Sequence, residues 1–194
     1  MAVLPPFRPI PKSEQRVESW KNGGGTTRTV AIDPPGSDFA TGFRWRISVA
    51  DVAVDGPFSV LPGLDRSLWL LAGNGVVLSC GGSATVLREP LQRLDFVGEA
   101  AITAARIDGP VRDVNVMTRR GEVAAVAFAG AAFEVAPAPQ QVVLALRGGA
   151  EVRIGNVLVH LEEGDALRAD APITIVVDAR EGAALGVGFF AARR

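Results

Sequence analysis

The chain has very few of the residues that most often carry out chemistry in enzymes. Its 194 residues include one histidine, His160, one cysteine, Cys80, and no tyrosine. A Ser-His-Asp or Cys-His site without a cofactor would have to use His160. A transition-metal site built from two or three imidazoles is excluded within one chain, and no clustered acidic loop indicates a site for a hard cation. We therefore expect neither a metal nor a cofactor.

An excess of charge and a long apolar run are also missing. The chain has 20 basic and 21 acidic residues, whereas binding to nucleic acid or to an anionic membrane normally leaves a basic excess. No stretch approaches the roughly 18 apolar residues that indicate a membrane span, and the N-terminus MAVLPPFRPIPKS has no apolar run of signal-peptide length. A single cysteine cannot form an internal disulfide, which fits a reducing compartment. These absences predict a cytoplasmic protein without nucleic-acid or membrane partners.

Short β-strands separated by glycine and proline account for most of the patterned sequence. Helical i, i+3, i+4 spacing is nearly absent, and 48% of the residues are hydrophobic, enough for a real core. Many short strands at such spacing predict an all-β barrel or sandwich. The expected strands are residues 27–32, 44–49, 67–71, 76–80, 84–87, 94–96, 101–107, 112–117, 142–147, 152–154, 157–161, 166–168, 173–177 and 184–190. Between 71 and 76, Ala-Gly-Asn-Gly predicts a hairpin.

A faint internal repeat indicates that the fold is duplicated. Residues 68–73 (LWLLAG) resemble 143–148 (VLALRG), and 94–99 (LDFVGE) resemble 161–165 (LEEGD). This rhythm of turns and strands resembles the cupin jelly roll, which predicts a bicupin of two cupin-type barrels packed together. We expect residues 1–15 to form an extended arm, 16–135 to form the first barrel, and 140–194 to supply most of the second.

The polar residues that could form a site alternate with apolar residues along two of the expected strands. In residues 44–49, Arg46 and Ser48 share one face of the strand, and Trp45, Ile47 and Val49 share the other. In residues 113–117, Asp113 and Asn115 lie on one face together with Met117.

One face of each strand of a small barrel points inward. If the polar faces do so, the barrel mouth holds a guanidinium, a hydroxyl, a carboxylate and an amide. Such a set suits a ligand with a carboxylate and an amide or imidazole group. If the apolar faces fill the barrel, Arg46 and Asp113 are exterior charges. The residues alone leave both arrangements open.

The remaining candidates lie in loops or on isolated positions. Trp20 and Asn22 precede the glycine triplet 23–25. These two residues either close over the barrel mouth, or Trp20 is a hydrophobic plug and the loop a simple turn. The triplet is not a P-loop, because no Lys-Ser/Thr follows it. Salt bridges that fix loops are expected from two adjacent pairs, Asp65-Arg66 and Arg119-Arg120. His160, on an apolar strand, is expected to be structural, and Cys80 to be a small buried residue.

Three segments together resemble the HutD/Ves family: residues 20–28 (WKNGGGTTR), 45–66 (from WRIS through GPFS to PGLDR) and 113–120 (DVNVMTRR). The resemblance covers residues 15–130 well. It implies a bicupin fold and an association with histidine utilisation, as a proposed regulator, or with stress induction, and no enzymatic activity is firmly attached to the family. This chain departs from the family pattern at Thr29, where a glutamate is usual, and at Val60-Leu61, where Arg-Phe is usual. Cupins that catalyse use a His-x-His, Glu and His set that the expected first barrel lacks.

The favoured hypothesis is a metal-free bicupin that binds a small carboxylate metabolite, such as urocanate or a formyl- or formimino-amino acid, and acts in regulation. Its expected ligand-binding residues are Trp20, Asn22, Arg46, Ser48, Asp113 and Asn115. A second hypothesis is a metal-independent hydrolase, lyase or isomerase that uses Asp113 or Asp65 as a base. A third is a protein-interaction module that uses the proline-rich arm and edge strands. A homodimer is compatible with each.

Overall fold

The computed structural model describes residues 7–180 and 182–192, and these residues are almost entirely β-structure. Among them, the one helical element is a 3₁₀ turn, η1 (Lys12–Glu14). The chain divides into a middle unit, Arg16–Glu122, and a terminal unit, which combines Met1–Gln15 with Val123–Arg194. Within the described part of the chain, no helix is long and apolar enough to cross a membrane.

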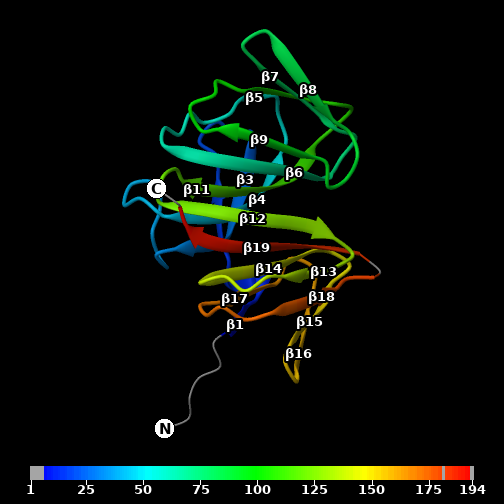
Figure 1. Ribbon diagram of the computed structural model, residues 1–194. Helices are drawn as coiled ribbons and strands as arrows, with labels where there is room; N and C mark the ends of the chain where they lie inside the picture. Colours follow the sequence, from blue (N-terminus) through cyan, green and yellow to red (C-terminus); the bar gives the residue numbers. More distant parts are fainter. Residues whose placement is uncertain (1–6, 181, 193–194) are drawn as a thin grey trace. The chain divides into compact units, whose positions relative to one another are not determined.

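The middle unit consists of a six-stranded and a four-stranded antiparallel sheet (Figure 1). In spatial order, the six-stranded sheet contains β2 (Arg16–Ser19), β3 (Gly25–Asp33), β4 (Trp45–Val52), β11 (Val111–Arg119), β6 (Leu64–Ala72) and β9 (Arg93–Val97). The four-stranded sheet contains β5 (Gly56–Pro57), β10 (Thr103–Arg106), β7 (Val76–Cys80) and β8 (Ser83–Leu87). Strands β4, β11 and β6 therefore lie side by side in the centre of the larger sheet.

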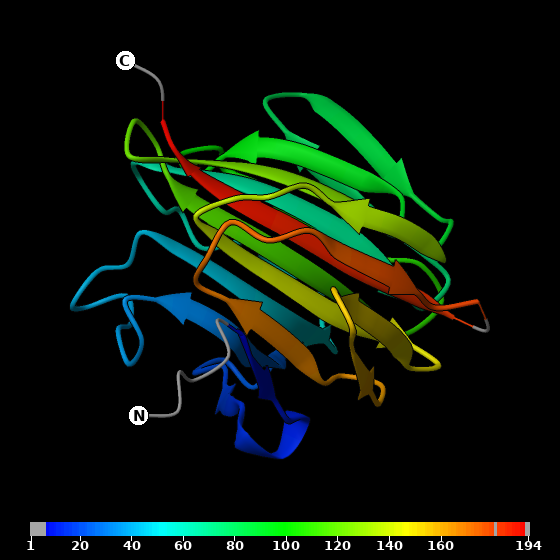
Figure 2. The same ribbon diagram turned by 60° about the horizontal axis from the view of Figure 1, so that its bottom comes forward.

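The terminal unit has a five-stranded and a four-stranded sheet. The first contains, in spatial order, β1 (Phe7–Ile10), β17 (Ala166–Ala169), β14 (Gln140–Arg147), β19 (Ala183–Ala191) and β12 (Val123–Gly130). The second contains β13 (Ala132–Val135), β18 (Ile175–Asp178), β15 (Ala150–Ile154) and β16 (Val157–Leu161). Figure 2 shows β19, in red, between its neighbours β12 and β14.

The two units repeat one topology. The order β4-β11-β6-β9 in the middle unit corresponds to β12-β19-β14-β17 in the terminal unit, and β5-β10-β7-β8 corresponds to β13-β18-β15-β16. Each strand keeps its place in chain order within this correspondence. The predicted all-β, duplicated cupin-type fold is therefore confirmed.

Matching hydrogen bonds identify which residues of the two copies are equivalent. Leu91 N donates to Leu70 O over 2.8 Å, and Leu70 N donates to Gln92 O over 3.0 Å. In the terminal unit, Gly164 N donates to Ala145 O over 2.8 Å, and Ala145 N donates to Asp165 O over 3.0 Å. The repeat of 68–73 in 143–148 is therefore correct. The repeat of 94–99 in 161–165 is wrong, because the Gly164-Asp165 turn corresponds to Leu91-Gln92.

Two predicted boundaries differ from the structure. The first barrel was expected to reach residue 135, but β12 pairs with β19 and β13 pairs with β18, so the middle unit ends at Glu122. The Ala-rich strand β12 has too weak an alternation to show this in the sequence. Part of the expected surface arm, Phe7–Ile10, forms β1 and extends the sheet by pairing with β17; residues 1–6 lie outside the described part.

The predicted hairpin at residues 72–75 is also wrong. Strand β6 pairs with β9 and β11, whereas β7 pairs with β8 and β10. The turn instead carries the chain from one sheet to the other. Gly73 and Gly75 have φ angles of 101° and 120° there, which side-chain-bearing residues rarely adopt.

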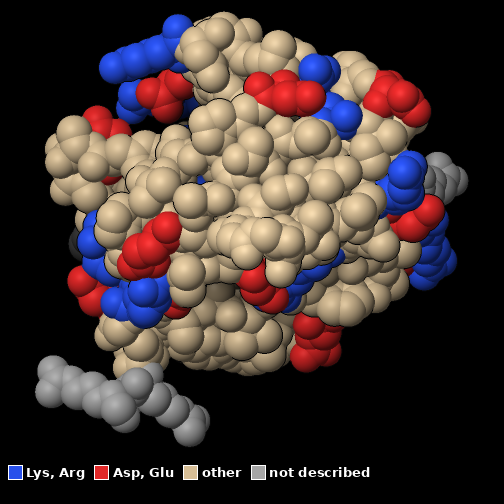
Figure 3. All heavy atoms as spheres, turned by 90° about the horizontal axis from the view of Figure 1, so that it is seen from above, with Lys and Arg blue, Asp and Glu red and all other residues tan. Residues whose placement is uncertain are grey.

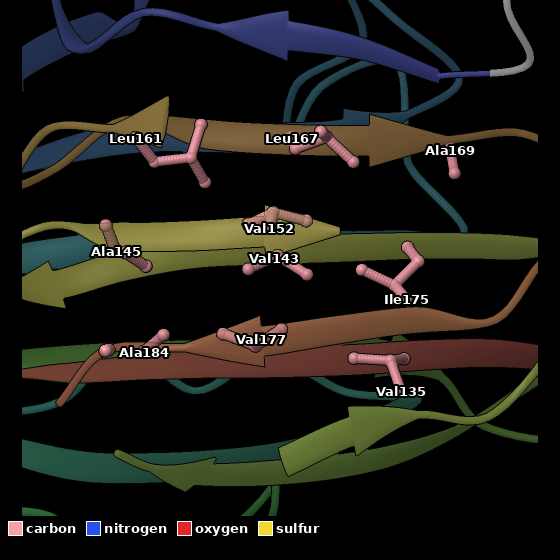
Figure 4. Packing of buried hydrophobic residues seen from close by; sticks show 12 residues of the cluster. Val135, Val143, Ala145, Val152, Leu161, Leu167, Ala169, Ile175, Val177 and Ala184 are labelled. Carbon is pink, nitrogen blue, oxygen red and sulfur yellow. The ribbon is translucent and has the colours of Figure 1, made fainter. Parts of the chain in front are cut away.

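Each unit has its own apolar core. In the terminal unit, side chains from both sheets, among them Val143, Val152 and Val177, fill the space between the layers (Figure 4). In the middle unit, Leu68, Leu70 and neighbours form a smaller core. On the face seen in Figure 3, basic and acidic side chains are intermingled around a broad uncharged area.

Candidate functional site

The middle unit contains a cavity of about 540 Å³, lined from both of its sheets. This volume lies within the range of small-molecule sites. The lining includes all six residues expected to bind a ligand: Trp20, Asn22, Arg46, Ser48, Asp113 and Asn115. Residues far apart in sequence therefore meet at one concave surface, as predicted, and their ligand-binding role remains a prediction.

Neighbouring strands bring the polar residues together. In the register of β4 and β11, Ser48 lies opposite Asn115 and Ala50 lies opposite Asp113. Arg46 and Asp113 are only 5% and 4% exposed, and both line the cavity. The alternative in which these two are exterior charges is therefore wrong. The apolar face of β4 is buried as well, since Trp45 and Ile47 are fully covered.

Arg66 joins this polar group, although the sequence indicated a loop salt bridge with Asp65. Adjacent residues on a strand point to opposite faces, so Arg66 of β6 points into the cavity, where it is 7% exposed. Its Nη2 donates to Asn115 Oδ1 over 3.0 Å, and Asn115 Nδ2 donates to Asp113 Oδ1 over 2.7 Å. The three side chains form a continuous hydrogen-bonded row.

The guanidinium of Arg66 is held by aromatic rings and is incompletely hydrogen-bonded. Its Cζ lies 5.3 Å from the centre of the Phe58 ring and 4.7 Å from that of Phe96. Nη1 donates a long bond of 3.4 Å to Ser59 O. Within the described residues, Nε is buried without a hydrogen-bond partner, which costs on the order of 1–3 kcal/mol in a protein interior. The positive charge of Arg66 at the cavity wall favours an anion in the cavity.

Arg46 has a neutral hydrogen-bond partner, Thr29. Its Nε and Nη2 donate to Thr29 Oγ1 over 3.2 and 2.6 Å, and its Cζ lies 5.0 Å from the centre of the Phe39 ring. A glutamate in place of Thr29 would neutralise this guanidinium. With threonine, the positive charge of Arg46 stays uncompensated by its neighbour.

Burial shifts the pKa of the charged groups in the cavity toward their neutral forms. It lowers the pKa of Arg46, and it lowers that of Arg66 to about 10. Burial raises the pKa of Asp113 from 3.8 to about 7, although the hydrogen bond from Asn115 and the charge of Arg66 oppose this change. At neutral pH the buried groups of the cavity therefore keep the two guanidinium charges of Arg46 and Arg66 but only part of the carboxylate charge of Asp113.

The loop of Trp20 and Asn22 is a tight turn at the cavity mouth. Trp20 Nε1 donates to Thr27 Oγ1 over 2.8 Å, and Asn22 Oδ1 accepts from Gly24 N over 2.9 Å. Gly23 N donates to Trp20 O over 2.9 Å. Because two amides of the glycine triplet already have partners, the turn does not form an anion-binding concavity of free N–H groups.

The other expected loop pairs are partly as predicted. Asp65 forms an ion pair with Arg120 at 2.7 Å, and Arg120 also binds Glu99 at 2.9 Å. The hydrogen bonds from Arg120 lower the pKa of Glu99 to about 2. Arg119 donates to Phe43 O over 3.1 Å and lies 4.0 Å from Glu122. These residues fix loops, whereas Arg66 does not belong with them.

Neither of the rare residues lies in the cavity. His160 is exposed on β16, and its Nδ1 is 3.6 Å from Glu151 of the neighbouring strand. Cys80 is exposed at the end of β7, contrary to the expectation that it is buried. Within residues 7–180 and 182–192, no group of three His, Cys, Asp or Glu residues could hold a metal ion.

Comparison with known proteins assigns the family. The HutD family model matches residues 12–186. The chain belongs to the HutD family. It is 37% identical over 150 residues to Protein Ves of Cronobacter sakazakii, which covers 76% of this chain and 80% of that protein. It is also 34% identical to an uncharacterised 21.2 kDa protein in the hutC 3′ region of Pseudomonas putida, over half of each chain.

Solved structures agree with this assignment. HutD from Pseudomonas fluorescens SBW25 superposes with a TM-score of 0.81 at 25% identity, over 96% of this chain and 100% of that one. A conserved protein of unknown function from Pseudomonas aeruginosa PAO1 gives a TM-score of 0.87 at 25% identity, over 95% and 98%. A cupin 2 conserved barrel protein from Leptotrichia buccalis, with a TM-score of 0.55 at 10% identity over 91% and 96%, shares the fold alone. The cupin-type architecture therefore extends well beyond HutD proteins.

Reasoning from the sequence missed three residues that shape the cavity of this HutD-family chain. Arg66 lies on the same face of β6 as the core residues Leu68 and Leu70. This spacing of two residues could have predicted that the side chain of Arg66 points inward. Phe58 and Phe39 flank the arginines from loops. No pattern in the sequence indicates those two contacts.

Proposed function

We propose that the middle-unit cavity binds a small carboxylate-bearing metabolite and that the chain acts in the regulation of histidine utilisation. The observation that carries this proposal is Arg66, a buried guanidinium that lines the cavity and whose Nε has no hydrogen-bond partner among the described residues. Arg46 adds a second buried guanidinium with a neutral partner. Two such groups favour an anion.

The shape of the arginine environment favours a planar anion. Phe58 and Phe96 cover the faces of Arg66, and Phe39 covers Arg46. Thr29 accepts from Nε and Nη2 of Arg46, and Asn115 accepts from Nη2 of Arg66. A carboxylate would therefore bind through the N–H groups that these partners leave over. The row of Asn115 and Asp113 beside Arg66 would read a second polar group on the ligand.

The family supports the choice of metabolite. The name HutD and the position of the Pseudomonas putida relative beside hutC are properties of those proteins; together with the arginine-lined cavity, they favour an intermediate of histidine breakdown as the ligand here. Urocanate and formyl- or formimino-amino acids each combine a carboxylate with a planar nitrogen-bearing group.

Calorimetric titration of the full chain with urocanate and with N-formylglutamate tests the proposal. We expect binding by the wild type and a loss of about 100-fold in Arg66→Met, which removes a charged hydrogen bond in a desolvated site. Arg112→Met is the matched control, because Arg112 lies on the same sheet but pairs outward with Asp51 at 2.7 Å. Urea unfolding of each variant checks that the fold is retained. The absence of binding by the wild type, or equal binding by Arg66→Met, contradicts the proposal.

A second candidate function is metal-independent catalysis with Asp113 as the general acid or base. It is favoured by a buried carboxyl whose pKa is raised to about 7 by burial and whose side chain reaches a cavity. Turnover of a bound metabolite, followed by product analysis, would support it if Asp113→Asn removed turnover while binding remained. If the wild type binds the metabolite without turning it over, catalysis is excluded and the regulatory function remains.

A further inference from the structure

Hydrogen-bond acceptors are scarce at the polar end of the cavity. Asn115 Oδ1 already accepts from Arg66, and Asp113 Oδ1 already accepts from Asn115. Within the described part of the chain, the cavity-lining acceptors Asp113 Oδ2 and Ser48 Oγ have no hydrogen-bond partner. Since an ammonium group carries three N–H donors and no acceptor, it would compete with Arg66 and Asn115 for this set of acceptors.

The charges around Asp113 also disfavour a cation. They come from the strands on either side of β11, from β11 itself and from the cavity mouth: Arg46, Arg66, Asp51, Arg112, Glu18, Lys21 and Asp55. Asp51 pairs with Arg112, and Asp55 pairs with Arg106 at 2.9 Å, all outside the buried part of the cavity. The buried charged neighbours that face the cavity are therefore both guanidinium groups, which would repel an ammonium.

We propose that the cavity selects carboxylates that carry no ammonium group, and that Asp113 binds them in its protonated form by donating its O–H to a ligand oxygen. This inference rests on the proposed function and names its ligand class. Asp113 has a single neutral donor, Asn115, and no ion pair within the described residues. A carboxyl in such a setting is held neutral at little cost and acts as a donor. When the ligand binds to a molecule in which Asp113 is ionised, the carboxylate takes one proton from solvent and forms its O–H bond; no other covalent bond changes.

Proton uptake makes the affinity depend on pH in a defined direction. With a pKa raised to about 7 by burial, Asp113 is mostly protonated at pH 6 and mostly ionised at pH 8. If only the protonated form binds the ligand, affinity falls by about tenfold between these two pH values. The affinity of an Asp113→Asn variant, which keeps a donor at this position, should not change over the same range.

The test is isothermal titration calorimetry of the full chain with matched pairs of probes. The pairs are urocanate with histidine and N-formylglycine with glycine, which differ at the nitrogen that carries the ammonium. Each acid is titrated at pH 6, 7 and 8 in two cationic amine buffers that cover this range and differ in ionisation enthalpy, because the difference in observed heat between the buffers gives the number of protons taken up. Wild type, Asp113→Asn and the outward-facing control Asp95→Asn, whose carboxylate pairs with Arg93 at 2.7 Å, are compared.

We expect the acid of each pair to bind at least tenfold more tightly than the amino acid. We also expect proton uptake that increases from pH 6 to pH 8 in wild type and in Asp95→Asn but is absent in Asp113→Asn. Binding of the acids without proton uptake, or equal binding of histidine and urocanate, overturns this inference and leaves the proposed function intact. If no acid binds at any pH to a folded wild type, both are overturned. Unfolding curves confirm that each variant is folded before it is titrated.

Discussion

The two units share one topology but use their interiors differently. The shared hydrogen bonds make Leu68 equivalent to Val143, and the strand registers then make Asn115 equivalent to Gly186. By the same register, Arg66 corresponds to Gln141. The middle unit thus has charged and amide groups where the terminal unit has glycine and glutamine.

Apolar side chains occupy the space in the terminal unit that is a cavity in the middle unit. A Cβ on Gly186 would lie 2.5 Å from atoms of both Phe133 and Val135. Gln141 is fully buried, and its amide is used by the backbone, with Nε2 donating to Ala136 O and Ile173 O over 3.0 and 2.8 Å. One copy of the fold therefore maximises packing, while the other keeps buried polar groups that cost stability and can bind a ligand.

The largest effect is expected when Asn115 of the cavity is copied to the equivalent position of the terminal unit, Gly186. Gly186→Asn should destabilise the protein by about 5 kcal/mol, because it adds overpacking to the burial of an amide without partners. The measurement is the free energy of unfolding in urea. Gly155→Asn is the control, since a Cβ at this turn position meets nothing within 4 Å and asparagine tolerates its φ of 57°.

The polar cavity should also give the protein a pH-dependent stability through Asp113. Burial raises the folded-state pKa to about 7, above the ordinary value of 3.8. The folded state then binds the proton more tightly, so this contribution is complete below about pH 4 and is lost as pH rises through 7. Its upper size is on the order of 4 kcal/mol. Unfolding curves at pH 5 and 8 should show a loss that is absent in Asp113→Asn; an equal loss in both proteins contradicts the expectation.

A smaller effect is expected where this chain departs from the family pattern. Thr29→Glu places a carboxylate beside Arg46 Nη2, now 2.6 Å from the threonine hydroxyl. The glutamate should compete with a bound carboxylate and weaken its binding by about tenfold. Titration with the same acids measures this change, and Thr29→Gln separates the effect of charge from that of size.

The smallest effect is expected at the turn that occurs in both units, at Leu91 in one and at Gly164 in the other. Leu91 has a φ of 68°, whereas its equivalent Gly164 has a φ of 91°. A side chain in this left-handed region costs about 1 kcal/mol. Leu91→Gly should therefore be more stable than Leu91→Ala by about that amount in urea unfolding, because both variants lose the same leucine contacts and alanine alone keeps the strain. Equal stability would mean that the turn bears no strain.

Much of the fold, and four of the polar residues that line the cavity, could be predicted from the sequence. Strict alternation in residues 44–49 and 113–117 placed Arg46, Ser48, Asp113 and Asn115 on shared strand faces, because side chains alternate with a period of two. Arg66 was missed since its neighbour Asp65 indicated a salt bridge, which strand geometry forbids between adjacent residues.

Features that depend on distant pairing could not be predicted. The Ala-rich strand β12 belongs to the terminal unit because of its register with β19, and no local pattern encodes that choice. The same holds for the two sheets joined at residues 72–75 and for the aromatic rings around Arg66. Sequence periodicity gives the faces of strands, whereas partners are selected by packing across the whole unit.

The pairing of β1 with β17 has a consequence for the order in which the chain folds. Phe7 lies opposite Ala169, so β1 cannot pair until β17 has been synthesised. All strands of the middle unit have been synthesised by Glu122. On a ribosome, the unit with the cavity can therefore fold first, and the packed unit forms only after its last strand, β19, has been synthesised.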